Sequence, residues 1–439
     1  MQSHKLGIRK WLSFIIAGLV GQLAWAIENN YLNLYVFAAS GSYDFIPLMT
    51  ALSAIAATIT TLLIGALSDR IGKRKIFISG GYILWGISII AFAFLDPKSS
   101  LTIVANSGFI AGVMIVIMDC VMTFFGSTAN DACFNASVND LTDSTNRGKV
   151  ESVLAVLPLI ALIAVTVVGG IFGISNTNGD PVHWDWFFYV FGGLTTIIGI
   201  VCLFLYPKDI KDPNKNEKYM ANIVYGFRPS VVKDNVNLYL CLLAFMIFNI
   251  AIQCFMPYLM VYIQRVLGIQ GGDFTITLGV VLVVASIITI VIGVFMDKIG
   301  RSKIMFPALI VAIIGALVFA FVRNQIGVII AGIVLMAGYL VSTALLSSKI
   351  RDYIPEGREG AFQGIRMVFV VMLPMVTGPY IGQGVSYING HTYVDDVYGT
   401  TSIEPNMFIF VFTAIILLFV FIPLIFLLRR EKKNEQATQ

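Results

Sequence analysis

Twelve long runs of apolar residues determine what this chain can fold into. About 20 apolar residues suffice for a helix to cross the hydrocarbon core of a bilayer, where backbone polar groups must bond within the chain. Of the 439 residues, 57% are hydrophobic and 12% are charged, against about 25% charge in a soluble domain. The sequence therefore predicts an all-α polytopic membrane protein with twelve transmembrane helices and excludes a soluble enzyme. The predicted spans are 11–37, 46–66, 76–95, 114–137, 149–173, 187–206, 236–266, 274–296, 304–322, 326–348, 360–386 and 405–428.

A polar segment divides the spans into two sets of six. We expect an N-terminal six-helix bundle over 1–206, a cytoplasmic central loop over 207–235, a C-terminal bundle over 236–428 and a cytoplasmic tail over 429–439. If both termini are cytoplasmic, 25 of the 29 lysines and arginines lie on the inner side. This bias matches the positive-inside rule. We therefore expect a plasma-membrane protein with both termini in the cytoplasm.

Four further features of the sequence bear on its chemistry and topology. The five cysteines lie in apolar runs without metal or disulfide spacing and indicate buried thiols. No nucleophile–base or metal-ligand pattern occurs, so the sequence predicts no enzyme, no metal and no cofactor. The first apolar run is too long for a signal peptide and indicates an uncleaved helix. Residues 96–113 are too apolar for an open loop, and we expect an interfacial segment on the outer side there.

Short motifs recur in the same order in both halves. "GALSDRIGKRK" (65–75) matches "GVFMDKIGRSK" (293–303), "NDLTDSTNRGK" (139–149) matches "RDYIPEGREGA" (351–361), and "NYLNLYV" (30–36) matches "PYLMVYI" (257–263). Three ordered matches indicate a duplicated six-helix unit. In transporters built from parallel six-helix repeats, the substrate site lies at the repeat interface near the midplane.

The motif at 65–75 resembles the signature loop of the major facilitator superfamily, and its weaker copy at 293–303 lies where that fold puts it. Glycine at position 72 permits a tight turn, and an aspartate at position 69 suits a helix N-terminus or a nearby arginine. The resemblance implies alternating access, with these loops latching the cytoplasmic side. The alternative is that the loops are basic only to set topology. The implied gate residues are Asp69, Arg70, Gly72, Arg74, Asp140, Arg147 and Glu151, with Asp297, Arg301, Asp352 and Arg358 in the second half.

Three carboxylates lie well inside predicted spans, away from the span ends. Glu28 occurs in "WAIENNYLNLYVF" and Asp119 and Asp131 in "MDCVMTFFGSTANDACFNASVND". A charge near the bilayer centre costs about 2.5–3.5 kcal/mol on insertion scales, so it usually marks function. The three histidines, at positions 4, 183 and 391, all lie outside the predicted spans. We therefore expect Glu28, Asp131 and Asp119 to carry the coupled proton.

Amide and aromatic side chains accompany these carboxylates. Arg366 is the one cation well inside a predicted span, and it should face an acid, either Glu28 or Asp131. Such a pair would have a purely structural role if it only fixes helix packing. The amides would likewise be structural if they only bond neighbouring helices. The candidate substrate-binding residues are Trp25, Glu28, Asn29, Tyr31, Asn130, Asn249, Gln253, Tyr258, Gln363 and Arg366.

Rings, amides and acids together suit a polyhydroxylated neutral solute. The runs "MTFFGSTANDACFNASVNDLTDSTNRGKVESVLAVLPLIA" and "KIRDYIPEGREGAFQGIRMVFVVMLP" resemble the glycoside–pentoside–hexuronide:cation symporters and the sucrose–proton symporters. In the sodium-coupled sugar symporters of that group the second span supplies aspartates for the cation. The second span of this chain has no acid, so the resemblance favours a proton over sodium. We expect proton-coupled sugar uptake by a monomer in the lipid bilayer, with no nucleic-acid partner. The alternatives are proton-coupled efflux of drugs or metabolites and a non-transporting sensor.

Overall fold

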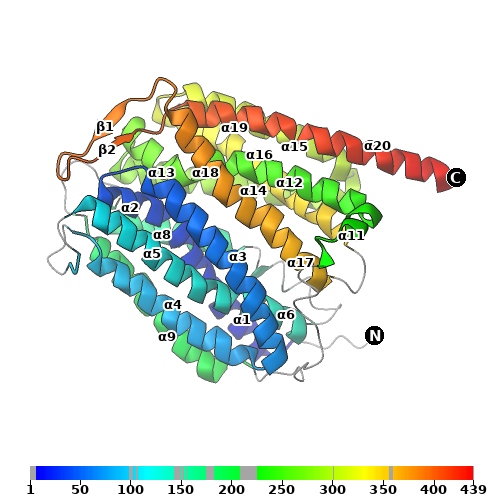
Figure 1. Cartoon of the computed structure of the whole chain (residues 1–439), viewed down its shortest axis with the longest axis horizontal. Helices are drawn as coiled ribbons and strands as arrows, with labels where there is room; N and C mark the ends of the chain where they lie inside the picture. The colour runs from blue at the N-terminus through cyan, green and yellow to red at the C-terminus, as the bar shows by residue number, and fades with distance from the viewer. Residues whose placement is uncertain are drawn as a thin grey trace. The chain divides into compact units, whose positions relative to one another are not determined.

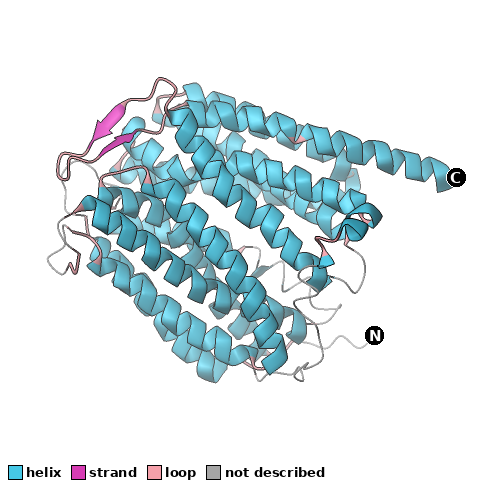
Figure 2. Ribbon diagram, viewed as in Figure 1, coloured by secondary structure: helices cyan, strands magenta, loops and turns pink. Residues whose placement is uncertain are grey.

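Helices occupy almost every long apolar run, because a helix bonds its own backbone where no water is available. A computed structural model describes residues 6–97, 102–104, 107–142, 150, 153–154, 156–174, 182–207, 225–299, 301–354 and 359–438. Among these residues, eleven helical stretches are long and apolar enough to cross a membrane. The remaining predicted span, 149–173, contains the shorter apolar helix Leu157–Ile171. The all-α membrane fold is therefore confirmed (Figures 1 and 2).

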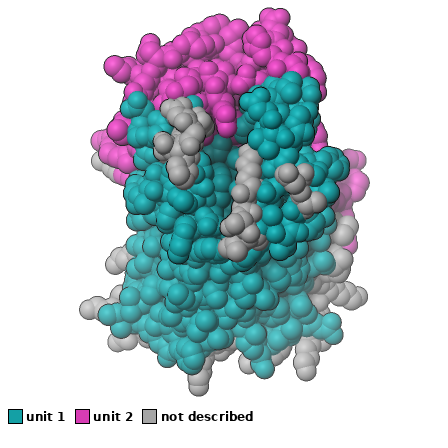
Figure 3. Space-filling model, turned by 90° about the vertical axis from the view of Figure 1, so that its left-hand side faces the viewer, with its two compact units in different colours: residues 1–217, 270–275, 393–402 teal, residues 218–269, 276–392, 403–439 magenta. Residues whose placement is uncertain are grey.

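The chain divides into two compact units (Figure 3). Unit 1 comprises residues 1–217, 270–275 and 393–402. Within it, α4 packs along α9, and α1 packs on α8 and α9. Its helices are α1 (Ile8–Ala26), η1 (Ile27–Tyr31), α2 (Leu32–Ser40), α3 (Phe45–Ile71), α4 (Arg74–Ala91), η2 (Phe92–Phe94), α5 (Gly108–Gly126), η3 (Ser127–Phe134), α6 (Asn135–Leu141), α8 (Leu157–Ile171) and α9 (Trp184–Leu205).

Unit 2 comprises residues 218–269, 276–392 and 403–439. Here α12 packs along α18 and α19, and α15 packs along α16. Its helices are α11 (Pro229–Asp234), α12 (Val236–Phe255), η4 (Met256–Tyr258), α13 (Leu259–Val261), η5 (Tyr262–Val266), α14 (Gly271–Ile299, whose first turn belongs to unit 1), α15 (Arg301–Phe321), α16 (Gln325–Tyr353), α17 (Glu359–Met367), η6 (Val368–Met372), α18 (Leu373–Ser386), α19 (Phe408–Phe419) and α20 (Phe421–Thr438).

Two local features differ from the expectations. Residues 108–113, expected in a segment separate from the fourth span, form the start of α5, which begins at Gly108 with its first turn capped by the side chain of Ser107. Between α18 and α19 the chain forms a hairpin of β1 (Thr392–Val394) and β2 (Thr401–Ile403), visible in Figure 2. Neither the cap nor the hairpin was predicted, since the apolar pattern marks spans and does not mark caps or short strands between them.

Four π-helical turns interrupt the long helices in the part of the chain that the structure describes. They are η1, η3, η5 and η6, and two of them contain predicted site residues: Glu28 lies in η1 and Asp131 in η3. A π-helical turn is rare, and it frequently marks a functional position. The extra residue in such a turn rotates the helix that follows it, so these turns decide which side chains face a neighbour.

Candidate functional site

The predicted carboxylates lie inside unit 1 among hydroxyl groups. Glu28 is 7% exposed, and its Oε1 accepts a hydrogen bond of 2.8 Å from Thr123 Oγ1. Asp119, 1% exposed and one turn before Thr123, is hydrogen-bonded to Ser53 of α3. Glu28 Oε2 and Asp119 Oδ1 are buried and have no hydrogen-bond partner among the described residues. Two buried carboxyl groups thus each keep one oxygen unoccupied.

Asp131 lies about three turns after Asp119 on the continuous α5–η3 helix. Its Oδ2 accepts a hydrogen bond of 3.1 Å from Ser127 Oγ in η3. Its side chain is half-buried, whereas Ser127 is fully buried. The described part of unit 1 therefore presents a row of carboxyl and hydroxyl groups along α5 and η3. Carboxyl groups take up and release protons, which is the chemistry that general acid–base sites use.

The amides and rings of unit 1 differ in how free they are to bind a solute. Asn29 is exposed, although its Nδ2 donates to the carbonyl of Trp25 at 2.9 Å. Trp25 is half-buried. Tyr31 is buried against Phe187, with ring centroids 5.2 Å apart. Asn130 is buried and donates to Tyr82 Oη at 2.9 Å, so this amide joins η3 to α4.

In unit 2 the predicted residues line α12, η4 and the α17–η6–α18 helix. Asn249 Nδ2 donates to the carbonyl of Val370 in η6 at 2.9 Å, and buried Tyr258 Oη donates to that of Pro379 at 2.9 Å. Gln253 is half-buried. The side chain of Gln363 lies outside the described residues.

Arg366 is also half-buried in unit 2. Its two candidate partners, Glu28 and Asp131, belong to unit 1. The pairing of Arg366 with either carboxylate therefore stays a prediction.

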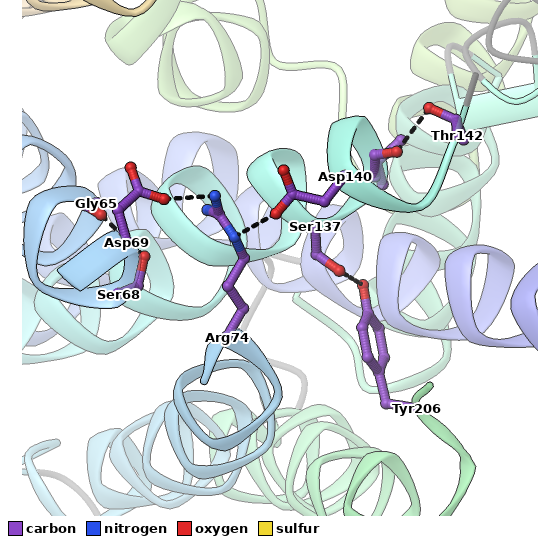
Figure 4. Close-up of polar contacts among 9 residues, drawn as sticks. Gly65, Ser68, Asp69, Arg74, Ser137, Asp140, Thr142 and Tyr206 are labelled. Atoms are coloured by element: carbon purple, nitrogen blue, oxygen red, sulfur yellow. Dashed lines mark hydrogen bonds and ion pairs between the residues drawn. The ribbon is translucent and has the colours of Figure 1, made fainter. Parts of the chain in front are cut away.

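At one end of unit 1, Arg74 joins two carboxylates from different helices (Figure 4). Its Nη2 lies 2.5 Å from Asp69 Oδ1, and its Nε lies 2.7 Å from Asp140 Oδ2. The Arg74 side chain is 8% exposed, whereas Arg70 in the same loop is exposed. Gly72 ends α3 with φ +70°, and its N–H donates to the carbonyl of Ser68 at 2.8 Å.

The triad, Asp69–Arg74–Asp140, thus links α3, α4 and α6. Beside it, Tyr206 Oη donates to Ser137 Oγ at 3.0 Å, which holds α6 against the end of α9. Arg147 and Glu151, the other predicted partners, lie outside the described residues.

The sequence of the second half differs from the first at the arginine of this triad. At the position that matches Arg74 the second copy has Ser302, so the sequence already lacks the arginine. Instead, Lys349 Nζ lies 2.6 Å from Glu431 Oε1 of α20, and Tyr353 Oη donates to the same oxygen. Asp352 is exposed, and the side chains of Asp297, Arg301 and Arg358 lie outside the described residues.

The sequence did not single out two aromatic residues of α4, Tyr82 and Trp85. Tyr82 bonds Asn130, the neighbour of Asp131, and Trp85 packs on Trp25, three residues before Glu28. Both are fully buried. Their signal was weak, since one tyrosine and one tryptophan three residues apart in "GGYILWG" read as ordinary core residues.

Comparisons with known proteins agree with this architecture. Residues 11–379 match the Major Facilitator Superfamily. No curated protein matches the sequence. Among solved structures, a variant of the nucleoside transporter NupG is similar with a TM-score of 0.72 and 12% identity, covering 95% of this chain and 99% of that one. A D-xylose–proton symporter is similar with a TM-score of 0.69 and 14% identity, covering 94% and 97%. The xylose transporter XylE from E. coli, in a partially occluded inward-open conformation, has a TM-score of 0.67 and 12% identity, covering 94% and 97%. Identities this low establish a shared fold only.

Proposed function

The chain belongs to the major facilitator superfamily and is a multi-pass membrane transporter, and from this premise we propose that it takes up a sugar together with a proton. The carboxyl groups of unit 1 carry the proposal. Glu28 and Asp119 are buried next to hydroxyl groups that already donate to one oxygen of each carboxyl. An isolated buried carboxylate costs several kcal/mol, and protonation removes that cost. A proton is therefore the ligand that these groups most readily accept.

The sugar is inferred from the surface around Glu28. Exposed Asn29 and half-buried Trp25 lie within one turn of Glu28. An aromatic ring covers the apolar face of a sugar, and an amide bonds its hydroxyl groups. Gln253 and Arg366, both half-buried in unit 2, stay predicted sugar-binding residues. One of the similar solved structures is named a D-xylose–proton symporter, so a relative on this fold carries both cargoes.

The proposed mechanism is alternating access. Sugar and proton enter from outside while the cytoplasmic side is closed, and the neutralised carboxyl groups permit the change of state. Release to the cytoplasm follows. The triad Asp69–Arg74–Asp140 is proposed to hold the cytoplasmic ends of α3, α4 and α6 as one body during this change. A membrane potential of about 100 mV is worth about 2.3 kcal/mol per charge, enough to concentrate a neutral sugar tens-fold.

The test is the external pH of de-energised, weakly buffered cells that contain the protein. Mono-, di- and small oligosaccharides are added one at a time. Alkalinisation with one sugar, lost in Glu28→Gln and in Asp131→Asn, supports the proposal and identifies the sugar class. Asp396→Asn, which neutralises an exposed carboxylate, is the matched control and should respond like the wild type. If no sugar causes alkalinisation, sugar–proton uptake is wrong, and proton-coupled efflux becomes the next hypothesis.

A further inference from the structure

Two of the three proposed proton-carrying residues lie in π-helical turns and not in regular α-helix. Glu28 lies in the π-helical turn η1, and Asp131 lies in η3. A π-helical turn is less stable than α-helix and persists where the surrounding packing supports it. If either turn reverted to α-helix, every later residue would rotate by about 100° relative to the preceding ones. The direction of both carboxyl groups therefore depends on what packs against these turns.

Tyr82 of α4 bonds to both helices that contain the turns. Its Oη donates to the carbonyl of Ala17 in α1 at 2.7 Å and accepts from Asn130 Nδ2 in η3 at 2.9 Å. Asn130 directly precedes Asp131. Tyr82 is 0% exposed, so water does not replace either bond. One hydroxyl group thus connects α1 to the middle of η3.

Trp85, one turn after Tyr82, packs between the starts of the two turns. Its ring lies edge-on to that of Trp25, with centroids 5.0 Å apart, and Trp25 precedes η1 by two residues. On another side it touches Gly126, the residue directly before η3. A Cβ atom added at Gly126 would lie 2.7 Å from Cε2 and Cζ2 of the Trp85 ring. Glycine is required here because the indole occupies that space.

We infer that Tyr82 and Trp85 are positioning residues for the carboxyl groups of unit 1. The two rings stack, with centroids 5.9 Å apart and planes at 14°, and so act as one rigid body between η1 and η3. Their role is to hold the two π-helical turns in one mutual arrangement, so that Glu28 and Asp131 keep their relative direction. Neither ring carries the proton. The inference rests on the proposed function, in which these two carboxyl groups take up the coupled proton.

The first test compares proton coupling in matched variants. Tyr82→Phe removes only the hydroxyl that joins α1 and η3. Tyr35→Phe is the control, because Tyr35 is also 0% exposed and its Oη donates to a backbone carbonyl, that of Phe92, at 2.6 Å. For groups that act by position, a displacement of about 1 Å can cost about 100-fold in rate. We expect Tyr82→Phe to lower proton-coupled uptake about ten-fold or more, to lower the number of protons taken up per sugar, and to shift the pH profile of uptake. Tyr35→Phe should leave the ratio and the profile unchanged.

Trp85→Phe tests the indole ring in the same way, by the number of protons taken up per sugar. Its control is Trp184→Phe, since Trp184 is 6% exposed and packs at 5.0 Å on Tyr35, elsewhere in unit 1. A merely structural role would lower the amount of folded protein in both variants alike. A positioning role predicts a changed proton-to-sugar ratio in Trp85→Phe alone. Equal ratios in Tyr82→Phe, Trp85→Phe and both controls would overturn the inference.

A second measurement does not depend on transport. In a background without cysteines, Asp131→Cys is labelled with a maleimide, with and without Tyr82→Phe. We expect the rate of labelling to change about three-fold or more when η3 loses its bond to Tyr82, because position 131 turns relative to its surroundings. Tyr35→Phe should not change it. An unchanged rate with Tyr82→Phe contradicts the inference. If wild-type protein moves no proton with sugar while labelling changes as expected, the proposed function fails and the positioning role stands.

Discussion

The Asp69–Arg74–Asp140 triad yields the most quantitative prediction. Replacing Arg74 with alanine removes both ion pairs at once and leaves two carboxylates, each 24% exposed, without their common cation. Removing one partner of a fully buried ion pair costs about 3–5 kcal/mol, whereas an exposed pair contributes about 0.2–1 kcal/mol. The triad lies between these limits. We therefore expect Arg74→Ala to lower the free energy of unfolding by about 2–3 kcal/mol.

Arg70→Ala is the matched control. Arg70 lies in the same loop and carries the same charge, but its side chain is exposed. Surface substitutions of this kind usually change stability by less than about 0.5 kcal/mol. Arg74→Lys should fall between the two alanine variants, because an ammonium group lacks the fork that reaches both carboxylates.

The assay is thermal unfolding of the purified protein in detergent, followed with a thiol-reactive dye. Four of the five cysteines are buried and would react only on unfolding, while Cys120 is half-buried. For units of about 150–250 residues, 1 kcal/mol shifts Tm by about 2–4 °C. Arg74→Ala should therefore lower Tm by about 5–10 °C. Asp69→Asn combined with Arg74→Ala should cost less than the sum of the single changes. Equal Tm values for Arg74→Ala and Arg70→Ala would refute the reasoning.

Three further predictions use the same thermal assay. Gly126→Ala should lower the free energy of unfolding by about 1–3 kcal/mol, because the added Cβ would lie 2.7 Å from the Trp85 ring and overpack it. Adding Trp85→Phe should recover much of that free energy, and no recovery would mean that the clash is not with Trp85. Burial raises the pKa of Glu404, and the nearby His391 and Arg265 side chains partly oppose this shift. The protonated carboxyl group therefore contributes stability below its unfolded pKa of about 4.3, and this stability is lost as pH rises through the higher folded pKa. Glu404→Gln should accordingly raise Tm relative to wild type at pH 7 and not at pH 4, and the opposite order would contradict that sign. Arg9 donates to the last two carbonyls of α9 at 2.8 and 2.6 Å. Arg9→Ala should cost about 1–2 kcal/mol, measured against Arg429→Ala, which replaces another exposed arginine; equal Tm values for the two variants would contradict this.

The sequence by itself determined the parts of the molecule that the bilayer dictates locally. Span length and the scarcity of charge follow from the thickness and polarity of the hydrocarbon core. The duplication is visible as ordered repeats, and Glu28 and Asp119 were recognisable because a carboxylate in an apolar run is expensive. The turn at Gly72 was predictable for a similar reason, since few residues other than glycine adopt its positive φ.

Tertiary structure decided which side chains meet. That Arg74 contacts Asp140, 66 positions away, depends on how three helices end beside one another. That Asn130 bonds Tyr82 and Trp85 touches Gly126 depends on the rotation of each helix and on two π-helical turns. An apolar run carries no record of that rotation, because many different faces of the helix are nearly equally hydrophobic. Contacts between helices arise from packing, and packing is a property of the whole fold.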